Sequence, residues 1–208
     1  MKRILYIESS PRKVRSHSIE VAREFLKEYE RLNPEDLIDR IDLWSLTLPP
    51  FSGEVIDTKY RIMHGEKVSE EKKSEWSKIV ELFNQFSSAD KYVFSVPMWN
   101  FGIPYRLKHY IDLITQPSLA WSFSPDDGYK GLVAGKVVIL YSSGGDYSEA
   151  TGLGELDYQK KPFENWLGFI GLGDFKIINI SPTLGPSEAV EQVIERAKVN
   201  AIDTAQDF

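Results

Sequence analysis

The sequence predicts an α/β protein with one parallel five-stranded sheet that is covered by helices on both faces. Short apolar runs of the kind that form doubly buried strands alternate five times with longer segments whose apolar residues recur every three or four positions. The length of 208 residues, of which 42% are hydrophobic, is enough for one sizeable core. We therefore expect a single domain over residues 1–208.

The first half of the chain begins with a strand and a helix. Residues 4–7 form the first apolar run, and His17–Leu32 has apolar side chains at helical spacing until Asn33-Pro34 ends the helix. Leu37–Leu43 predicts a second, shorter strand. Residues 44–65 show no regular period, so we expect an irregular segment of the kind that often borders a site or a partner surface.

The middle of the chain repeats the alternation. Apolar residues along one side predict a helix at about 69–87, which leads into a strand at 91–97. Pro104 then opens a helix that continues to about residue 115. A second irregular segment is expected at 116–135.

The last third supplies the remaining two strands. Val137–Tyr141 predicts the fourth strand and residues 176–180 the fifth, with a helix between them that begins near Asp157. The final helix follows Gly185-Pro186. With right-handed crossovers between parallel strands, we expect the strand order 2-1-3-4-5.

Composition excludes several classes of function. The net charge is −6 with both signs interspersed, which argues against a nucleic-acid surface. Cysteine is absent, so disulfides and thiolate chemistry are excluded, and the three histidines lack metal-ligand spacing. The apolar run near the N-terminus is too short for a signal peptide, and no stretch approaches the ~20 apolar residues of a membrane span. We expect a cytoplasmic protein with no metal and no membrane or nucleic-acid partner.

Three loops should meet at one edge of the sheet. They lie at 9–18, 97–101 and 142–145, after the first, third and fourth strands. In the expected order these loops converge near the switch point between strands 1 and 3, where ligands of open α/β sheets bind. The chain contains no nucleophile elbow, paired carboxylate motif or metal motif, which favours chemistry carried by a bound cofactor.

The first loop carries hydroxyl groups immediately before a helix. Its candidate binding residues are Ser10, Ser16, His17 and Ser18. Donors around a helix N-terminus are a natural seat for phosphate, and the absence of glycine excludes both common glycine-rich nucleotide loops. A single terminal phosphate on a mononucleotide is the better candidate. The alternative is that Ser16 or Ser18 only caps the helix.

The second loop is flat and polarizable. It consists of Met98, Trp99, Asn100 and Phe101. Three large side chains around one amide suit a planar heteroaromatic ring better than a sugar or a bare phosphate. The alternative is that these side chains belong to the core, although four successive residues at a strand end cannot all face one core.

The third loop consists of Ser142, Ser143, Gly144 and Gly145. A Ser-Gly cluster after a strand is most often only a turn, and that interpretation stays open. At this edge of the sheet, however, two adjacent glycines let the backbone come within hydrogen-bond distance of a flat ligand.

The same three stretches carry a resemblance to a known family. PMWNFGIPYRLKHYIDLI at 97–114, SSPRKVRSHS at 9–18 and SSGG at 142–145 resemble the FMN-dependent NADH azoreductases, which are also NADH:quinone oxidoreductases of flavodoxin-like fold. The resemblance covers nearly the whole chain and is most specific at 97–101. The family commonly has Arg at the position of Ser143, so the electrostatics of the third loop differ here.

The resemblance implies an enzyme that binds FMN, takes a hydride from NADH or NADPH, and passes two electrons to quinones or aromatic azo compounds by a ping-pong scheme. The first loop would hold the FMN phosphate, the second the isoalloxazine ring and the third its N1–O2 edge. A homodimer with two flavin sites near the interface is also implied. Substrates would stack on aromatic residues matching Phe101, Phe123 and Phe169, with Tyr at the position of Phe123 in some members.

A flavodoxin-like electron carrier that binds FMN but has no substrate of its own is the alternative. Such carriers usually show a strongly acidic docking face, whereas a net charge of −6 over 208 residues is unremarkable. The response of the bound flavin to NADH separates the two.

Overall fold

The computed structural model describes residues 1–208, and its main sheet contains five parallel strands. They are β1 (Arg3–Glu8), β2 (Leu37–Asp42), β3 (Lys91–Pro97), β6 (Lys136–Ser142) and β7 (Phe175–Ile180). Their order is β2-β1-β3-β6-β7. This is the expected order 2-1-3-4-5, because β4 and β5 form a separate hairpin.

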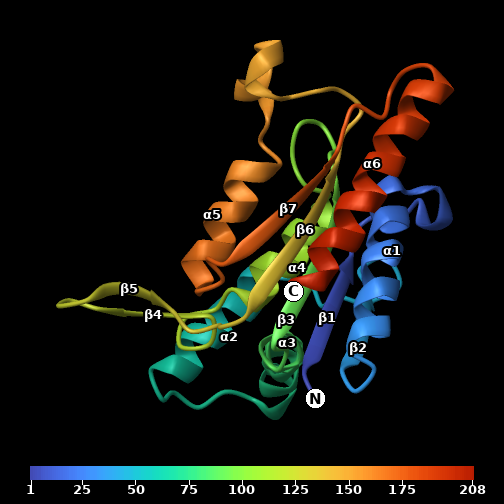
Figure 1. Ribbon diagram of the computed structural model, residues 1–208. Helices are drawn as coiled ribbons and strands as arrows, with labels where there is room; N and C mark the ends of the chain where they lie inside the picture. The colour runs from blue at the N-terminus through green and yellow to red at the C-terminus, as the bar shows by residue number, and fades with distance from the viewer.

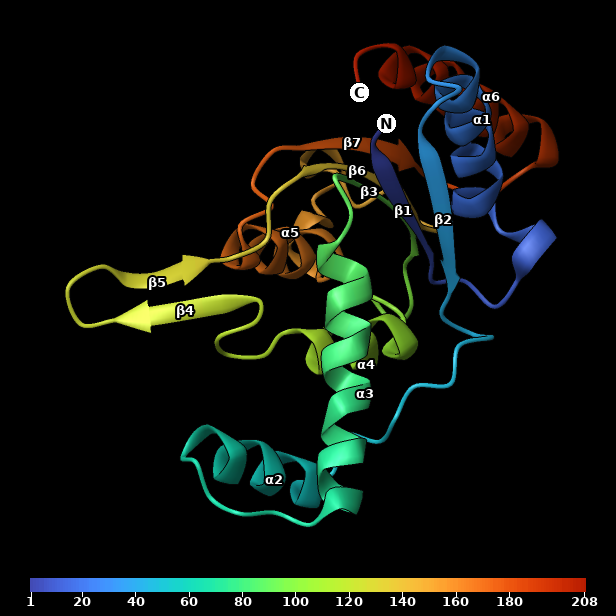
Figure 2. The ribbon, with the colours of Figure 1, turned by 90° about the horizontal axis from the view of Figure 1, so that it is seen from below.

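Helices cover both faces of the sheet (Figure 1). Turned as in Figure 2, the structure shows α1 (His17–Leu32) and α6 (Ser187–Gln206) side by side on one face. The other face is covered by α3 (Glu70–Ser87), α4 (Tyr105–Ile114) and α5 (Lys160–Ile170). The predicted helices are thus present, with α5 beginning slightly later than the expected start near residue 157.

The central strands are mostly apolar because both of their faces are buried. Tyr92, Phe94 and Val96 of β3 belong to the core beneath α3, α4 and α5. Val93 belongs instead to the core beneath α1 and α6, together with Ile4 of β1. Each fully buried side chain of this size contributes about 1.5–3 kcal/mol of transfer free energy. This double burial rigidly positions the loops at the carboxyl ends of the strands.

The expectation of an irregular segment at 44–65 is wrong for its second half. Residues Gly53–Met63 form a helix, α2, whose buried face carries Thr58 and Lys59 beside Val55. A helix is predicted from apolar residues that recur every three or four positions, and the two polar residues on this buried face interrupt that period. Ser52 caps the helix by accepting a hydrogen bond from the Val55 amide at 3.3 Å.

The expectation for 116–135 is also wrong in part, because the segment contains an antiparallel hairpin. Its strands are β4 (Trp121–Ser124) and β5 (Gly128–Gly131). Alternating WSFS followed by Asp127-Gly128 is a hairpin signal, and Gly128 has the positive φ of 71° that such a turn requires. The hairpin extends away from the rest of the structure in both ribbon views (Figures 1 and 2).

None of the helices is both long and apolar enough to cross a bilayer. No three His, Cys, Asp or Glu side chains are grouped so that they could hold a metal ion.

Candidate functional site

A cavity of about 390 Å³ lies at the carboxyl edge of the sheet, where the loops after β1, β3 and β6 meet. The predicted residues that line it are Ser10, Ser16, His17, Met98, Trp99, Ser142, Ser143 and Gly144. The remaining predicted residues of these loops, Ser18, Asn100, Phe101 and Gly145, do not line it. The three loops thus meet at one edge, as their place after the strands predicts.

The first loop presents hydroxyl groups that are not used for helix capping. Ser16 occupies the N-cap position of α1, but its side chain makes no capping hydrogen bond. Instead the Ser16 and Ser18 hydroxyl oxygens lie 3.2 Å apart, and both residues are buried. The alternative that these serines serve only as caps is therefore not supported. The positive end of the α1 dipole remains open toward the cavity.

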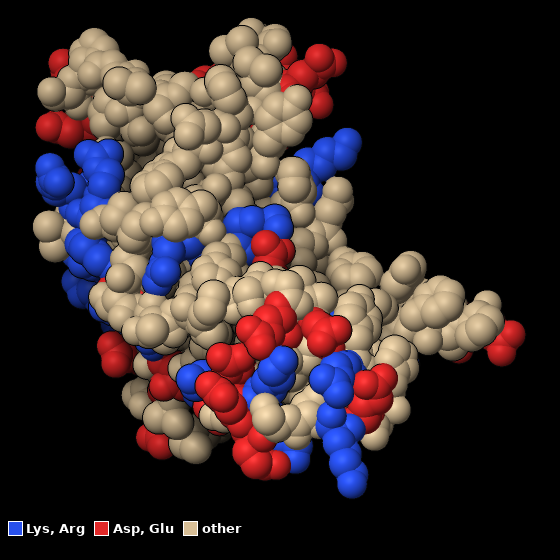
Figure 3. Space-filling model, turned by 180° about the vertical axis from the view of Figure 1, so that it is seen from behind, with Lys and Arg blue, Asp and Glu red and all other residues tan.

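Positive charge surrounds this loop. Within it, η1 (Lys13–Arg15) is a short 3-10 helix, and Lys13 forms an ion pair with Asp42 at the end of β2. Arg12 lines the cavity and makes no ion pair. Seen from behind, Lys and Arg side chains gather along the edge on which the first loop and β2 lie, whereas the lower half carries mixed charges (Figure 3). An anion is therefore favoured at this end of the cavity.

The second loop is a tight turn from Trp99 to Gly102. The amide of each of these two residues donates a hydrogen bond to the carbonyl oxygen of the other, at 2.8 and 2.9 Å. Asn100 and Phe101 between them have φ values of 47° and 69°. Two successive positive φ angles are typical of a type I′ turn, which normally takes Asn or Gly, so Phe101 is held in a strained conformation.

None of the four predicted ring-binding residues is fully buried, so the alternative that they are core residues is not supported. Met98 and Trp99 are partly exposed, and Asn100 and Phe101 are exposed. The Phe101 ring makes an edge-to-face contact with Tyr147, with centroids 6.1 Å apart. An exposed ring on a strained turn at a sheet edge points to ligand contact.

Trp44 connects the first two loops, and the sequence did not single it out. Its indole Nε1 donates a hydrogen bond to the Ser9 carbonyl oxygen at 2.9 Å. Its ring lies 5.6 Å from the ring of Trp99 and 5.4 Å from that of Tyr105, measured between centroids. No local pattern distinguishes this role, because it depends on a contact between segments 35 residues apart in the chain.

A fourth loop, after β7, completes the wall of the cavity. Thr183 and Leu184 line it beside the third loop. The other three loops were predicted because ligands of open α/β sheets bind at the carboxyl ends of strands. Residues 181–185 follow the carboxyl end of the fifth strand, so the same rule applies to them. Pro97 and Arg12 are further lining residues outside the predicted set.

Two titratable groups lie beneath the third loop. Tyr141, the residue before Ser142, belongs to the core on the α5 side, and burial raises the pKa of its hydroxyl far above the usual range. Burial also raises the pKa of the Glu164 carboxyl on α5. Neither side chain lines the cavity, so neither is placed to exchange protons with a ligand there.

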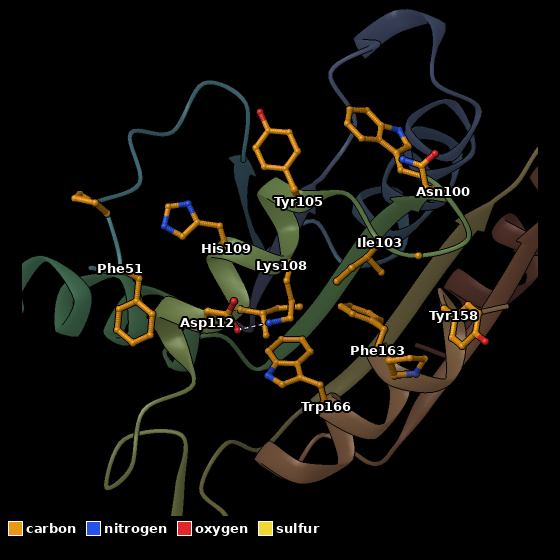
Figure 4. A pocket seen from close by; sticks show the side chains of 15 residues that line it. Phe51, Asn100, Ile103, Tyr105, Lys108, His109, Asp112, Tyr158, Phe163 and Trp166 are labelled. Atoms are coloured by element: carbon orange, nitrogen blue, oxygen red, sulfur yellow. Dashed lines mark hydrogen bonds and ion pairs between the residues drawn. The ribbon is translucent and has the colours of Figure 1, made fainter. Parts of the chain in front are cut away.

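A larger cavity of about 900 Å³ lies on the other side of the Trp99–Gly102 turn (Figure 4). Ile103, Phe163 and Trp166 form an apolar floor, and Lys108 projects toward it. The charged groups of this cavity are paired internally, since Lys108 Nζ lies 2.5 Å from Asp112 Oδ1. His109 Nε2 lies 3.0 Å from the Pro49 carbonyl oxygen, so this ring contacts the backbone of residues 44–52.

Phe123 and Phe169 do not lie beside Phe101 within one chain. Phe169 contacts Trp121 and Tyr129 of the hairpin, and Tyr129 contacts Phe123. The hairpin leads directly into the amino end of β6 and packs on the C-terminus of α5, where the Val133 amide donates to the Ile170 carbonyl oxygen at 2.9 Å. This aromatic cluster is therefore at the edge of the sheet opposite to the cavity.

Comparisons with known proteins agree with this architecture. Residues 2–203 match the family model for the flavodoxin-like fold. The chain is 43% identical, over all of its length and 98% of the relative, to an FMN-dependent NADH:quinone oxidoreductase of Desulfotalea psychrophila. It is 41% identical to a protein of the same name from Nitratidesulfovibrio vulgaris, over 92% of this chain and 96% of that one.

Solved structures give the same result. An azoreductase from Bacillus anthracis superposes with a TM-score of 0.92 at 27% identity, over 100% of both chains. An FMN-dependent NADH-azoreductase from the same species, in complex with FMN, superposes with a TM-score of 0.86 at 26% identity, over 99% of this chain and 100% of that one. These findings confirm the resemblance seen in the sequence: the chain belongs to the flavodoxin-like family of FMN-dependent NADH:quinone oxidoreductases and azoreductases.

Proposed function

We propose that this protein is an FMN-dependent oxidoreductase that transfers electrons from NADH or NADPH to quinones and aromatic azo compounds, with FMN held in the cavity at the carboxyl edge of the sheet. The observation that supports this most directly is that three loops far apart in the sequence line one cavity of about 390 Å³. The names of the relatives support the same reaction.

The chemistry of the lining residues fits FMN. No carboxylate lines the cavity, and one end of it combines Ser10, Ser16 and His17 with Arg12 at the open end of a helix dipole. This end suits the phosphate, and Ser18 would add a third hydroxyl group to those of Ser10 and Ser16. Met98, Trp99, Asn100 and Phe101 would contact the ring, and residues 142–145 its N1–O2 edge. FMN supplies the chemistry by accepting a hydride and delivering two electrons.

The protein's own contribution is orientation and charge stabilisation. The double burial of β3 and β6 fixes the loops that follow them, so the groups around the ring need little rearrangement during reaction. We expect donor and acceptor to use one open face in turn, which gives a ping-pong scheme. Initial rates measured against NADH concentration, at several fixed quinone concentrations, should give parallel lines in double-reciprocal plots. Intersecting lines would contradict the scheme.

A homodimer would reconcile the position of the hairpin with a role in substrate stacking. Phe123 and Phe169 are far from Phe101 within one chain, so they reach a substrate there only if a second copy supplies them. Light scattering should then give twice the mass of one chain. The Phe123→Ala variant should raise the KM for a quinone, whereas a monomeric enzyme with full activity would exclude this arrangement. The cytoplasmic location expected from the sequence stays a prediction.

The proposed function has a direct spectroscopic test. The purified protein should carry a yellow chromophore, lose its colour with NADH in the absence of air, and regain it when a quinone is added. A yellow protein that NADH does not bleach within minutes would instead be an electron carrier. A protein that fails to bind FMN at all would refute the proposal.

A further inference from the structure

The loop after β7 fixes the direction of the peptide groups in the third loop. Thr183 Oγ1 donates a hydrogen bond to the Ser143 carbonyl oxygen at 2.9 Å, and the Thr183 amide donates to the same oxygen at 3.0 Å. The Gly144 carbonyl oxygen accepts from the amides of Thr183 and Leu184, at 3.1 and 3.0 Å. Two successive carbonyl groups are thereby held on the β7 side of the third loop.

In a β-strand successive carbonyl groups point to opposite sides, whereas the carbonyl groups of Ser143 and Gly144 point to the same side. One residue earlier, the Ser142 carbonyl oxygen still faces β3, where it accepts from the Met98 amide at 2.7 Å. In a trans peptide the N–H points opposite to the C=O. Because β6 lies between β3 and β7, the amides of Gly144 and Gly145 both point toward the β3 side, where the second loop lies.

These two adjacent donors have no partner within the chain. Neither the Gly144 amide nor the Gly145 amide donates a hydrogen bond to any other group of the protein. Gly144 itself lines the cavity. Successive backbone N–H groups that point the same way form a concave site for an oxygen atom or an anion.

We propose that Thr183 is a positioning residue, which aims the Gly144 and Gly145 amides at the edge of FMN where negative charge collects on reduction. The inference rests on the proposed function, and it assigns Thr183 an effect on the redox potential in addition to binding. Donors that are fixed before charge develops stabilise that charge without a cost of reorganisation. A contact that favours reduced over oxidised FMN raises the midpoint potential of the bound cofactor.

Three variants test this role. Thr183→Val keeps the shape of the side chain and removes its hydroxyl donor, whereas Thr183→Ser keeps the donor. Thr151→Val is the matched control, because Thr151 Oγ1 also donates to loop carbonyl oxygens, those of Asp146 and Ser148, at 3.0 and 2.8 Å. Neither of those carbonyls belongs to residues 142–145.

The measurement is the two-electron midpoint potential of FMN bound to each variant. Loss of one positioning hydrogen bond should reduce the preference for reduced FMN about fivefold, which lowers the potential by about 20 mV. Thr183→Ser should restore the wild-type potential, and Thr151→Val should not change it. Equal potentials in the wild type and Thr183→Val would overturn the proposal.

Hydrogen exchange in the wild type gives a second test that does not require any variant to fold. Binding of FMN should slow the exchange of the Gly144 and Gly145 amides at least about tenfold, while the Thr183 amide, which is already hydrogen-bonded, should change little. Unchanged rates at both glycines in the FMN-loaded protein would also overturn the proposal. Failure of the wild type to bind FMN is a separate result, which would refute the proposed function itself.

Discussion

Phe101 offers a direct test of whether the second loop is held in a strained conformation. Its φ of 69° lies in the left-handed region, which costs an L-residue about 1–2 kcal/mol and glycine almost nothing. Phe101→Gly should relieve this strain, whereas Phe101→Ala should retain it. Both variants lose the same aromatic ring, so the difference between them isolates the backbone.

The expected magnitude follows from two opposing terms. Glycine loses about 0.5–1 kcal/mol more conformational entropy than alanine on folding, so the glycine variant should be the more stable by about 1 kcal/mol. In the interior of a helix the difference in stability between glycine and alanine has the opposite sign, because alanine is the more stable residue there. Phe101 is 43% exposed, so loss of its ring costs about 1–2 kcal/mol relative to the wild type and largely offsets the relief of strain.

Urea unfolding of the FMN-free proteins measures this difference, provided that both variants unfold with the same m-value. A difference of about 1 kcal/mol also corresponds to about 2–4 °C in Tm for a chain of this size. An alanine variant as stable as the glycine variant would refute the reasoning about strain. With FMN bound, both variants should lose kcat/KM equally, by up to about tenfold, because an aromatic contact is worth about 0.5–1.5 kcal/mol.

Three further predictions concern other parts of the structure. Asn100→Ala should weaken FMN binding or slow its reduction, while His109→Ala should do neither; equal affinities and rates by flavin titration and stopped-flow absorbance would contradict the placement of the ring. Trp44→Phe removes the indole hydrogen bond to the first loop and should weaken FMN binding about fivefold in a fluorescence titration; an unchanged Kd would exclude a role for this bond. A hydrogen bond from Tyr29 lowers the pKa of Asp36, so this carboxylate stabilises the fold above its unfolded pKa of about 4. The stability lost in Asp36→Asn, measured by urea unfolding, should therefore shrink as pH falls from about 6 to about 3, and a loss that is constant with pH would contradict this.

Local sequence patterns predicted the strands and helices in which buried apolar side chains recur at regular positions. The apolar run at 137–141 indicates a strand because both of its faces are buried, and the period of His17–Leu32 indicates a helix because one face is buried. The pattern failed for α2, whose buried face includes Thr58 and Lys59. The hairpin was missed although alternation and an Asp-Gly pair were present.

Alternating burial and parallel connections leave few topologies, so local patterns are enough to predict the strand order and the three loops that meet at one edge. The contacts that shape the site are visible only in the folded chain. The bond from Trp44 to the first loop and the hydrogen bonds from Thr183 to the third join segments distant in the chain, and the positive φ of Phe101 is imposed by the turn that closes between Trp99 and Gly102. Such contacts leave no local period in the sequence, since their free energy depends on partners that only folding brings together.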